Sequence, residues 1–287
     1  MPAVQIPPGV EGLVALQELP DQDWESRWSR IVVPAAMKER LLNYVVFSLR
    51  HRAGLSPVGL PVHGLVVLSG PPGTGKTTLA GGLADQAARA IGEAIFFAEV
   101  DPHSFPSQML GESQRSVARL FERTLPDLAR RGRPTIVLLD EVESIAVSRG
   151  GASLETNPVD VHRATDAVLA GLDHVARDCP NVTFVATTNH AVGVDEAFLS
   201  RSDLIEVFEL PGVDAVRAIL LDTLGELIPG WAATGPALEH VAARCVASRM
   251  DARQVRKLIL RAVTSRRELA LEPRKLRIED IAATLDA

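Results

Sequence analysis

A glycine-rich segment, GPPGTGKT at residues 70–77, constrains the fold of this 287-residue chain more than any other feature. It follows the short apolar run GLVVLSG (64–70) and precedes a helix-length segment at 76–90. Glycines allow the backbone to curl so that its N–H groups surround a phosphate, and the positive end of the following helix favours negative charge. The segment therefore predicts a phosphate-binding loop between a buried strand and a helix. A glycine-rich turn with a solvated lysine is the alternative, and the flanking strand and helix make it the weaker interpretation.

The side chains of this loop have separate expected roles. Lys76 is expected to neutralise the β- and γ-phosphates of a nucleotide, and Thr77 to offer its hydroxyl to Mg²⁺. The full set of residues expected to bind nucleotide here is Gly70, Pro71, Pro72, Gly73, Thr74, Gly75, Lys76, Thr77 and Thr78.

A second part of the predicted site is IVLLDEVE, residues 136–143. Its apolar residues predict a buried strand that brings Asp140 and Glu141 to the carboxyl edge of a sheet, where ligands bind in open α/β folds. Asp140 is expected to hold Mg²⁺, directly or through water. Glu141 is expected to polarise the attacking water as a general base. Glu143 is interpreted as a surface or subunit-contact residue, and the alternative for the adjacent acidic pair is that it caps the next helix.

Short apolar runs alternate with helix-length segments over most of the chain. The runs are 64–70, 94–100, 135–141, 181–189 and 203–210, and the helical segments are 34–50, 76–90, 113–131, 159–176 and about 195–202. Continuous apolar strands that alternate with helices indicate a parallel sheet covered on both faces, an α/β fold.

After Leu210-Pro211-Gly212 the strand patterns stop, and helical patterns follow near 213–226, 236–245, 251–269 and 278–286. We therefore expect three regions: an extended proline- and glycine-rich leader at 1–23, a large α/β domain at 24–211 and a small helical domain at 212–287.

Composition excludes several classes of function. The formal net charge is −6, so no basic field attracts the chain to nucleic acid or to anionic lipid. The longest uncharged stretch is broken by proline and glycine, which argues against a membrane helix, and no secretion signal is recognisable. Cys179 and Cys245 lie far apart without metal-ligand spacing and are interpreted as buried small apolar residues. We expect a cytoplasmic protein.

The phosphate loop, the DE pair and the segment TTN (187–189) together resemble the AAA+ ATPases, over roughly residues 24–287. The resemblance implies an ATPase that uses ATP and Mg²⁺. It also implies that Asn189 contacts the γ-phosphate or the attacking water, although Asn189 could instead cap the following turn. Arg201, just before the last core strand, matches the family's arginine finger, which reaches the γ-phosphate of a neighbouring subunit. A surface arginine paired with Asp203 is the alternative.

The same resemblance extends to the lid and to the adenine pocket. In MDARQVRKL (250–258), Arg253 or Arg256 corresponds to the lid arginine that contacts nucleotide, and Arg253 is favoured. Ile31 and Val32 match the segment that packs on adenine, although core packing would explain them equally well.

The stretch PSQMLGES (106–113) lies where AAA+ rings project a loop into their central channel. Met109 stands at the aromatic position of that loop, Leu110 at the aliphatic position, and Gly111 follows. The resemblance implies that these residues grip a client protein, whereas an apolar pair tucked into the core is the alternative.

Within the AAA+ proteins, three segments look most like the pachytene-checkpoint branch, which remodels HORMA-domain proteins. They are LLDEVESIAVSR, VDEAFLSRSDLIEVFELP and DARQVRKL. Only about two dozen residues precede the expected ATPase domain, which resembles the short bacterial members associated with a HORMA protein and a cyclic-oligonucleotide synthase in anti-phage signalling. The resemblance implies a homohexameric ring that opens a HORMA client, separates it from the synthase and thereby restrains signalling.

Two other classes of function remain as alternatives. One is an AAA+ loader or remodeler that acts on another protein or on a DNA-bound complex, for which a basic stripe would be expected. The other is a nucleotide-gated scaffold with little turnover, although such a scaffold need not keep the hydrolytic Glu141.

Overall fold

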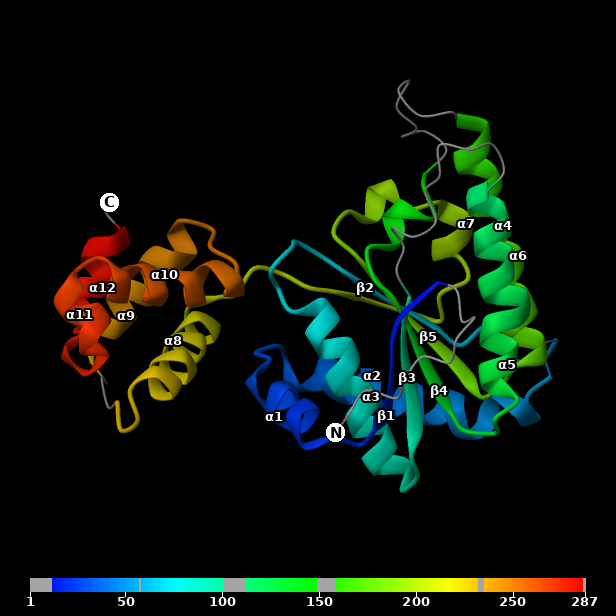
Figure 1. The fold of residues 1–287 in the computed structure, drawn as a ribbon, viewed down its shortest axis with the longest axis horizontal. Helices are drawn as coiled ribbons and strands as arrows, with labels where there is room; N and C mark the ends of the chain where they lie inside the picture. The colour runs from blue at the N-terminus through cyan, green and yellow to red at the C-terminus, as the bar shows by residue number, and fades with distance from the viewer. Residues whose placement is uncertain (1–11, 57, 101–111, 149–157, 232–234, 286–287) are drawn as a thin grey trace. The chain divides into compact units, whose positions relative to one another are not determined.

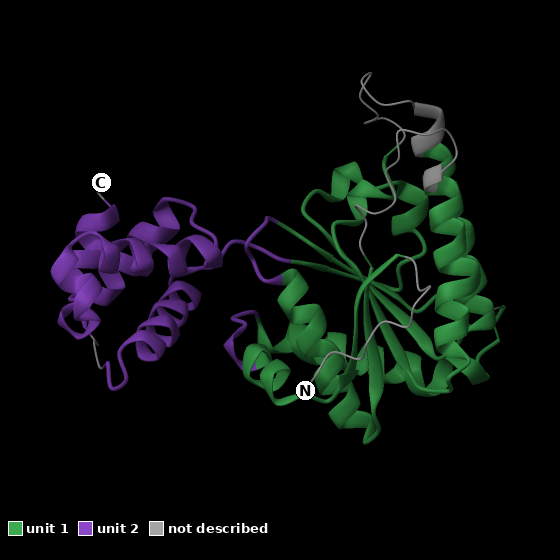
Figure 2. Ribbon diagram, viewed as in Figure 1, with its two compact units in different colours: residues 1–28, 34–70, 76–207 green, residues 29–33, 71–75, 208–287 purple. Residues whose placement is uncertain are grey.

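The computed structural model describes residues 12–56, 58–100, 112–148, 158–231 and 235–285. Met109, Leu110 and Gly111, the predicted channel-loop residues, lie outside the described residues. The chain divides into two compact units (Figure 2). The first holds residues 1–28, 34–70 and 76–207, and the second holds 29–33, 71–75 and 208–287.

The first unit is built on a six-stranded sheet with the order β1-β3-β4-β5-β2-β6. The strands are β1 (Leu13–Leu19), β2 (Leu65–Ser69), β3 (Ile95–Val100), β4 (Thr135–Leu139), β5 (Val182–Thr188) and β6 (Leu204–Val207). Every neighbouring pair is parallel except β1 with β3. All five apolar runs identified in the sequence form strands, and the predicted α/β fold is confirmed.

Strands β2, β4 and β5 are buried along their whole length, because helices cover both faces of the sheet. In Figure 1, α2 and α3 lie on one side of the sheet and α4, α5 and α6 on the other. The helices of this unit are α1 (Gln22–Arg30), α2 (Ala35–His51), α3 (Lys76–Ile91), α4 (Glu112–Arg119), α5 (Leu125–Ala129), α6 (Pro158–Asp178) and α7 (Glu196–Leu199). Both faces of the central strands are therefore withdrawn from water, which accounts for their unbroken apolar runs.

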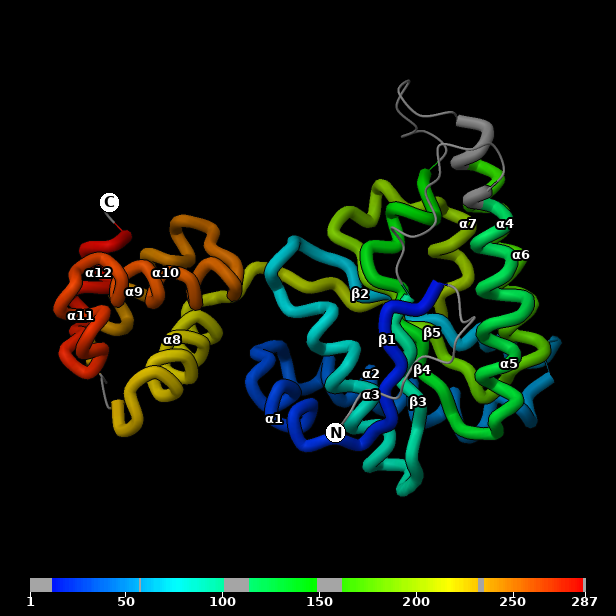
Figure 3. Tube along the Cα trace, viewed as in Figure 1, coloured from blue at the N-terminus to red at the C-terminus, as the bar shows by residue number. Residues whose placement is uncertain are grey.

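Part of the expected leader belongs to the sheet. Residues 13–19 form β1, which lies beside β3 (Figure 3) and pairs with it antiparallel. Leu16 and Leu19 of this strand are buried. The sequence predicts an extended leader but not its pairing, because an edge strand depends on a partner some 80 residues away in the chain. Helix α1 was also not predicted.

The segment expected as one helix at 113–131 contains a π-helical turn, Leu120–Thr124, between α4 and α5. Pro126 stands in the first turn of α5 and has no N–H to donate to the preceding turn. The wider turn, in which Leu125 N–H bonds to Leu120 C=O, lets the helix axis continue past this proline.

The second unit is helical and has its own apolar core. Its helices are α8 (Val213–Leu227), α9 (Pro236–Ala247), α10 (Ala252–Thr264), α11 (Arg267–Leu271) and α12 (Ile278–Leu285). The predicted helix at 251–269 is two helices, separated at Ser265 and Arg266. Cys245 lies in this core and Cys179 in that of the first unit, and both are free thiols, as expected.

No helix within the described ranges is long and apolar enough to cross a bilayer.

Candidate functional site

Lys76 is the first residue of α3 and is 6% exposed. Its ammonium donates to the carbonyl oxygen of Gly70 at 2.7 Å and to Oδ1 of Asn189 at 2.9 Å. Gly70 and Asn189 follow directly after the paired strands β2 and β5, in which Ser69 stands beside Thr188. The sheet register thus brings the predicted phosphate-binding lysine and the predicted sensor asparagine together.

Asp140 follows β4 and is half-buried. The Thr77 hydroxyl donates to its Oδ1 at 2.9 Å. Two hard oxygen ligands at this spacing suit Mg²⁺, which proteins commonly bind through one or two carboxylates together with substrate phosphates. In the described part of the chain, this site included, no cluster of three or more His, Cys, Asp or Glu residues could hold a metal ion.

Glu141 is exposed at the carboxyl edge of the sheet and has a left-handed backbone conformation, with φ at 50°. Such a conformation is uncommon for a residue with a side chain and persists only where surrounding contacts hold it. The Glu141 N–H donates to Oγ1 of Thr187 at 3.0 Å, and the Glu141 carbonyl accepts from the backbone N–H and the hydroxyl of Ser144, both at 2.9 Å. Asn189 Nδ2 lies 3.4 Å from Glu141 Oε1. The side-chain amide of Asn189 therefore lies between Lys76 and Glu141.

Thr187 is a residue that the sequence analysis did not single out. It is 2% exposed, and its hydroxyl donates to Asp140 Oδ1 at 2.5 Å while it accepts the Glu141 N–H. Leu139 pairs with Ala186 in the β4–β5 register, so Asp140 and Thr187 are the next residues along each strand. Register between strands cannot be read from either strand alone, which is why the sequence analysis missed it.

Glu143 was interpreted as a surface or subunit-contact residue. Its side chain is partly buried and makes a contact within the chain, while a subunit contact stays a prediction. Its side chain turns inward, and Oε1 accepts the backbone N–H of Asn189 at 3.0 Å. Its Oε2 is shielded from solvent and has no hydrogen-bond partner among the described residues. The turn after β4 is therefore bonded to the end of β5 twice, through the Glu141 N–H to Thr187 and through the Glu143 carboxylate to the Asn189 N–H.

Glu99, on β3, adds a further carboxylate near Asp140. Burial raises the pKa of Glu99, and the negative charge of Asp140 raises it further. No motif marked this residue, because it lies within an apolar strand.

Arg201 lies between α7 and β6, with about a quarter of its side chain exposed. Its Nε and Nη2 donate to the two carboxylate oxygens of Asp173 in α6, at 2.8 and 2.9 Å. This hydrogen bonding lowers the pKa of Asp173 and raises that of Arg201. The alternative pairing of Arg201 with Asp203 is wrong, because Asp203 accepts instead from the Tyr44 hydroxyl and from backbone N–H groups at the start of β2.

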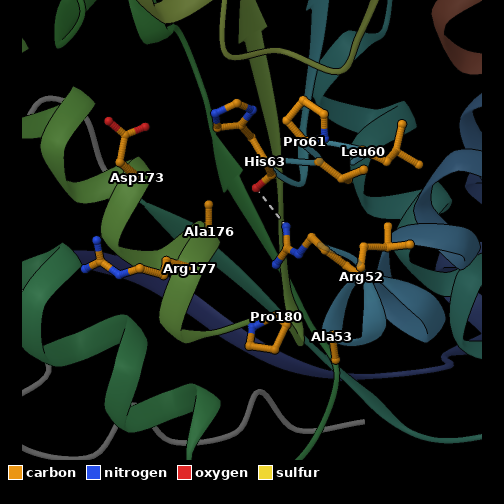
Figure 4. Close-up of a pocket in the computed structure, with 11 residues that line it drawn as sticks. Arg52, Ala53, Leu60, Pro61, His63, Asp173, Ala176, Arg177 and Pro180 are labelled. Carbon is orange, nitrogen blue, oxygen red and sulfur yellow. Dashed lines mark hydrogen bonds between the residues drawn. The ribbon is translucent and has the colours of Figure 1, made fainter. Parts of the chain in front are cut away.

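Asp173 also lines a cavity of about 480 Å³ (Figure 4). Leu55, Leu60 and Pro61 supply apolar wall, and Arg52 lies beneath, donating to the His63 carbonyl at 2.8 Å. None of the predicted nucleotide-binding residues lines this cavity.

In the second unit, residues 71–75 lie beside the start of α10. A Cβ on Gly73, where φ is +76°, would come within 2.4 Å of Asp251 Oδ1, so only glycine fits at this point. Asp251 is the N-cap of α10 and forms a capping box with Gln254. A Cβ on Gly75 would lie 3.9 Å from Ile31, which places this predicted adenine residue beside the loop.

The remaining predicted residues of this unit are more exposed. Val32 is 38% exposed, and Arg253 and Arg256 are both exposed on α10. Arg253 stands two residues after Asp251, the residue that contacts the phosphate loop, whereas Arg256 is almost one turn further along the helix.

Among the other loop residues, Thr74 is buried and donates to the Pro71 carbonyl at 2.9 Å, while Pro72 and Thr78 are exposed.

At the edge of the sheet, the first unit thus gathers an ammonium, a hydroxyl–carboxylate pair, a second carboxylate and an amide. Hydrogen bonds join Lys76 to Asn189, Asn189 to Glu141 and Thr77 to Asp140. This set can bind a phosphate with a divalent cation and orient a water molecule for attack.

The sequence pattern that defines the AAA family, the ATPase family associated with various cellular activities, matches residues 66–210. CD-NTase-associated protein 6 of Pseudomonas aeruginosa is 42% identical over 281 residues, which cover 96% of this chain and 91% of that protein. The pachytene checkpoint protein 2 homolog of Arabidopsis thaliana is 31% identical over 73% of this chain and 46% of its own length. This chain thus spans about half of the plant protein.

Solved structures agree on the fold. A chain in the Escherichia coli MS115-1 HORMA:CdnC:Trip13 complex matches with a TM-score of 0.80 at 20% identity, covering 97% of this chain and 96% of that chain.

Proposed function

The chain belongs to the AAA family of ATPases, within its pachytene-checkpoint branch, and from this premise we propose that it remodels a HORMA-domain client by hydrolysing ATP. The observation that supports the ATPase half is the hydrogen-bonded set of Lys76, Asn189 and Glu141 beside Asp140 and Thr77. A relative named for its association with a CD-NTase, and a fold shared with a chain of a HORMA:CdnC:Trip13 complex, support the choice of client.

In the proposed reaction, a water molecule attacks the γ-phosphorus of ATP, and the bond from that phosphorus to the β–γ bridging oxygen breaks to leave ADP and phosphate. Glu141 polarises the water and accepts its proton. Lys76 neutralises charge on the β- and γ-phosphates, and Asn189 orients the water or the γ-phosphate. Asp140 and Thr77 would hold Mg²⁺, which offsets phosphate charge when bound.

Arg201 completes the site of a neighbouring subunit in a ring, which we propose is a homohexamer. In the ring, its guanidinium would leave the carboxylate of Asp173 and bind the phosphate that is being transferred. Arginine binds a phosphate through two parallel N–H···O bonds, as it binds a carboxylate. From the helical unit, Arg253 would contact the nucleotide, and Ile31 and Val32 would pack on adenine.

Met109, Leu110 and Gly111 would grip a segment of the client in the channel of the ring. Opening the HORMA protein would separate it from a second-messenger nucleotidyltransferase and restrain anti-phage signalling. We expect Met109→Ala or Leu110→Ala to leave basal ATP hydrolysis near the wild-type rate and to abolish client remodelling. Loss of ATP hydrolysis with unchanged remodelling per ATP would place the pair in the core instead.

The test mixes the protein and ATP with a HORMA protein bound to its partner and follows dissociation of that complex. Wild type is expected to release the partner, whereas Lys76→Ala, which lacks the phosphate-binding ammonium, is not. Absence of release with HORMA complexes from the same gene neighbourhood would refute the choice of client. ATP hydrolysis that survives Glu141→Gln would refute the assigned mechanism, and stimulation by DNA would favour a DNA-acting enzyme.

A further inference from the structure

We infer that Thr187 is a positioning residue, whose one hydroxyl sets Asp140 and Glu141 in the arrangement required for Mg²⁺–nucleotide binding and hydrolysis. The inference rests on the roles proposed above for these two carboxylates. It assigns a function to a residue whose hydroxyl is hydrogen-bonded to Asp140 and to the Glu141 N–H.

The Thr187 hydroxyl acts both as a hydrogen-bond donor and as a hydrogen-bond acceptor. Its hydrogen is donated to Asp140 Oδ1 at 2.5 Å, and its oxygen accepts the Glu141 N–H at 3.0 Å. A buried hydroxyl with both contacts made cannot turn to other partners, and Thr187 is 2% exposed. The side chain therefore acts as a fixed link between the end of β5 and the two residues that follow β4.

Each contact has a separate consequence. Asp140 Oδ1 receives two hydroxyl donors, Thr77 and Thr187, and Thr187 is the buried one of the two. Without Thr187, the hydrogen bonds among the described residues leave Asp140 the Thr77 hydroxyl, which would also be a ligand of Mg²⁺. Glu141 has a left-handed backbone, so loss of the acceptor for its N–H leaves this uncommon conformation less well held.

Outer-sphere partners of metal ligands affect metal affinity by about 10- to 100-fold when they are removed. A displacement of about 1 Å in a catalytic group can lower a rate by about 100-fold. A Thr187→Val substitution keeps the shape of the side chain and removes the hydroxyl, so both effects are expected together. Thr187→Ser restores the hydroxyl and is expected to restore both.

Thr183 provides a matched control. It lies four residues earlier on the same strand, is fully buried, and shares a hydrogen bond of 2.9 Å with Ser48 at the opposite end of the strand. Thr183→Val removes a buried hydroxyl of the same kind without touching the site. Thermal unfolding of both valine variants establishes that each is folded at the assay temperature.

The primary measurement is the Mg²⁺ concentration that gives half-maximal binding of a fluorescent, non-hydrolysable ATP analogue. Thr187→Val is expected to raise it about tenfold or more, with Thr187→Ser and Thr183→Val within about twofold of wild type. In the second measurement, kcat for ATP is expected to fall by about 10- to 100-fold in Thr187→Val, with a smaller change in KM.

A Thr187→Val protein with wild-type Mg²⁺ dependence would overturn the inference, as would an equal shift in Thr183→Val. Failure of Thr187→Ser to restore binding would also overturn it. Failure of the proposed function has a different signature, in which wild type itself does not hydrolyse ATP or is unaffected by Glu141→Gln. The Mg²⁺ dependence of analogue binding still decides the role of Thr187 in that case.

Discussion

At the residue scale, the candidate site depends on carboxylates whose surroundings differ. Asp140 accepts two hydroxyl donors, Glu143 is turned inward, and Glu99 is half-buried within β3 near Asp140. Burial and a like charge both disfavour the ionised form of Glu99. The protein therefore carries a destabilising carboxylate beside its site.

This gives a pH-dependent prediction for Glu99→Gln. The pKa of Glu99 is raised in the folded protein above its ordinary value of 4.5, so the folded state binds more protons than the unfolded state in this range. The free energy of unfolding of wild type should therefore fall as the pH rises from about 4.5 through the folded pKa. Glu99→Gln should be more stable than wild type at pH 7, and this advantage should vanish below about pH 4.

Urea unfolding at a series of pH values measures this difference. Glu122→Gln, which neutralises an exposed carboxylate, is the control and should change stability little at any pH. A Glu99→Gln protein that is less stable than wild type at pH 7 would contradict the prediction.

At the element scale, two glycines of α3, the helix that follows the phosphate loop, allow α1 to pack closely against it. A Cβ on Gly81 of α3 would lie 2.3 Å from the ring of Trp24, and one on Gly82 would lie 3.0 Å from Trp28. Trp24 also packs edge-on against Phe97 and donates through Nε1 to Gln17 at 2.8 Å. Helix α1 thus approaches α3 closely and leads into the segment that holds Ile31.

Gly81→Ala is expected to destabilise the protein by about 1–3 kcal/mol, because the added methyl group overlaps the Trp24 ring. The same substitution at Gly225 in α8, where a Cβ would meet nothing within 4 Å, is the matched control. Gly225→Ala should stabilise by about 0.5–1 kcal/mol, the ordinary advantage of alanine over glycine in a helix. Denaturant unfolding with tryptophan fluorescence measures both.

A second substitution checks the physical cause. Trp24→Leu removes the ring that the methyl group would overlap, so Gly81→Ala should cost less in that background than in wild type. Equal costs in the two backgrounds would show that the ring is not the cause.

At the scale of the whole molecule, the proposed ring requires each active site to use residues of two subunits. Glu141→Gln subunits cannot activate water but keep Arg201, whereas Arg201→Ala subunits keep Glu141. Arg201→Ala alone should lose about 1000-fold or more of its ATPase rate. Glu141→Gln alone should lose about 100- to 10,000-fold. Mixing them should restore part of the rate, because an intact Glu141 then lies beside an intact Arg201.

Steady-state ATP hydrolysis across mixing ratios measures this restoration. Arg177→Ala, which changes an exposed arginine on the same helix as Asp173, should keep the wild-type rate. A mixture no more active than its components would place Arg201 in its own subunit's site or outside the reaction.

The sequence by itself determined five of the six strands, most of the helices and the place of the predicted phosphate loop between a strand and a helix. The run IVLLDE predicts a buried strand with two carboxylates at its end, and GPPGTGKT predicts a loop between a strand and a helix. These patterns depend on neighbours a few residues apart, where backbone sterics and apolar periodicity act. The same locality explains why the helical lid could be predicted while the break at Ser265 could not.

Only the tertiary structure decided which side chains meet. The contact of Thr187 with Asp140, the inward turn of Glu143, the pairing of Arg201 with Asp173 and the addition of β1 to the sheet join residues 28 to more than 80 positions apart. Such contacts are set by strand register and by how the helices pack. Glu143 and Thr187 therefore carry no local signal of their roles, because a carboxylate or a hydroxyl acquires a partner only when the fold brings one within 3 Å.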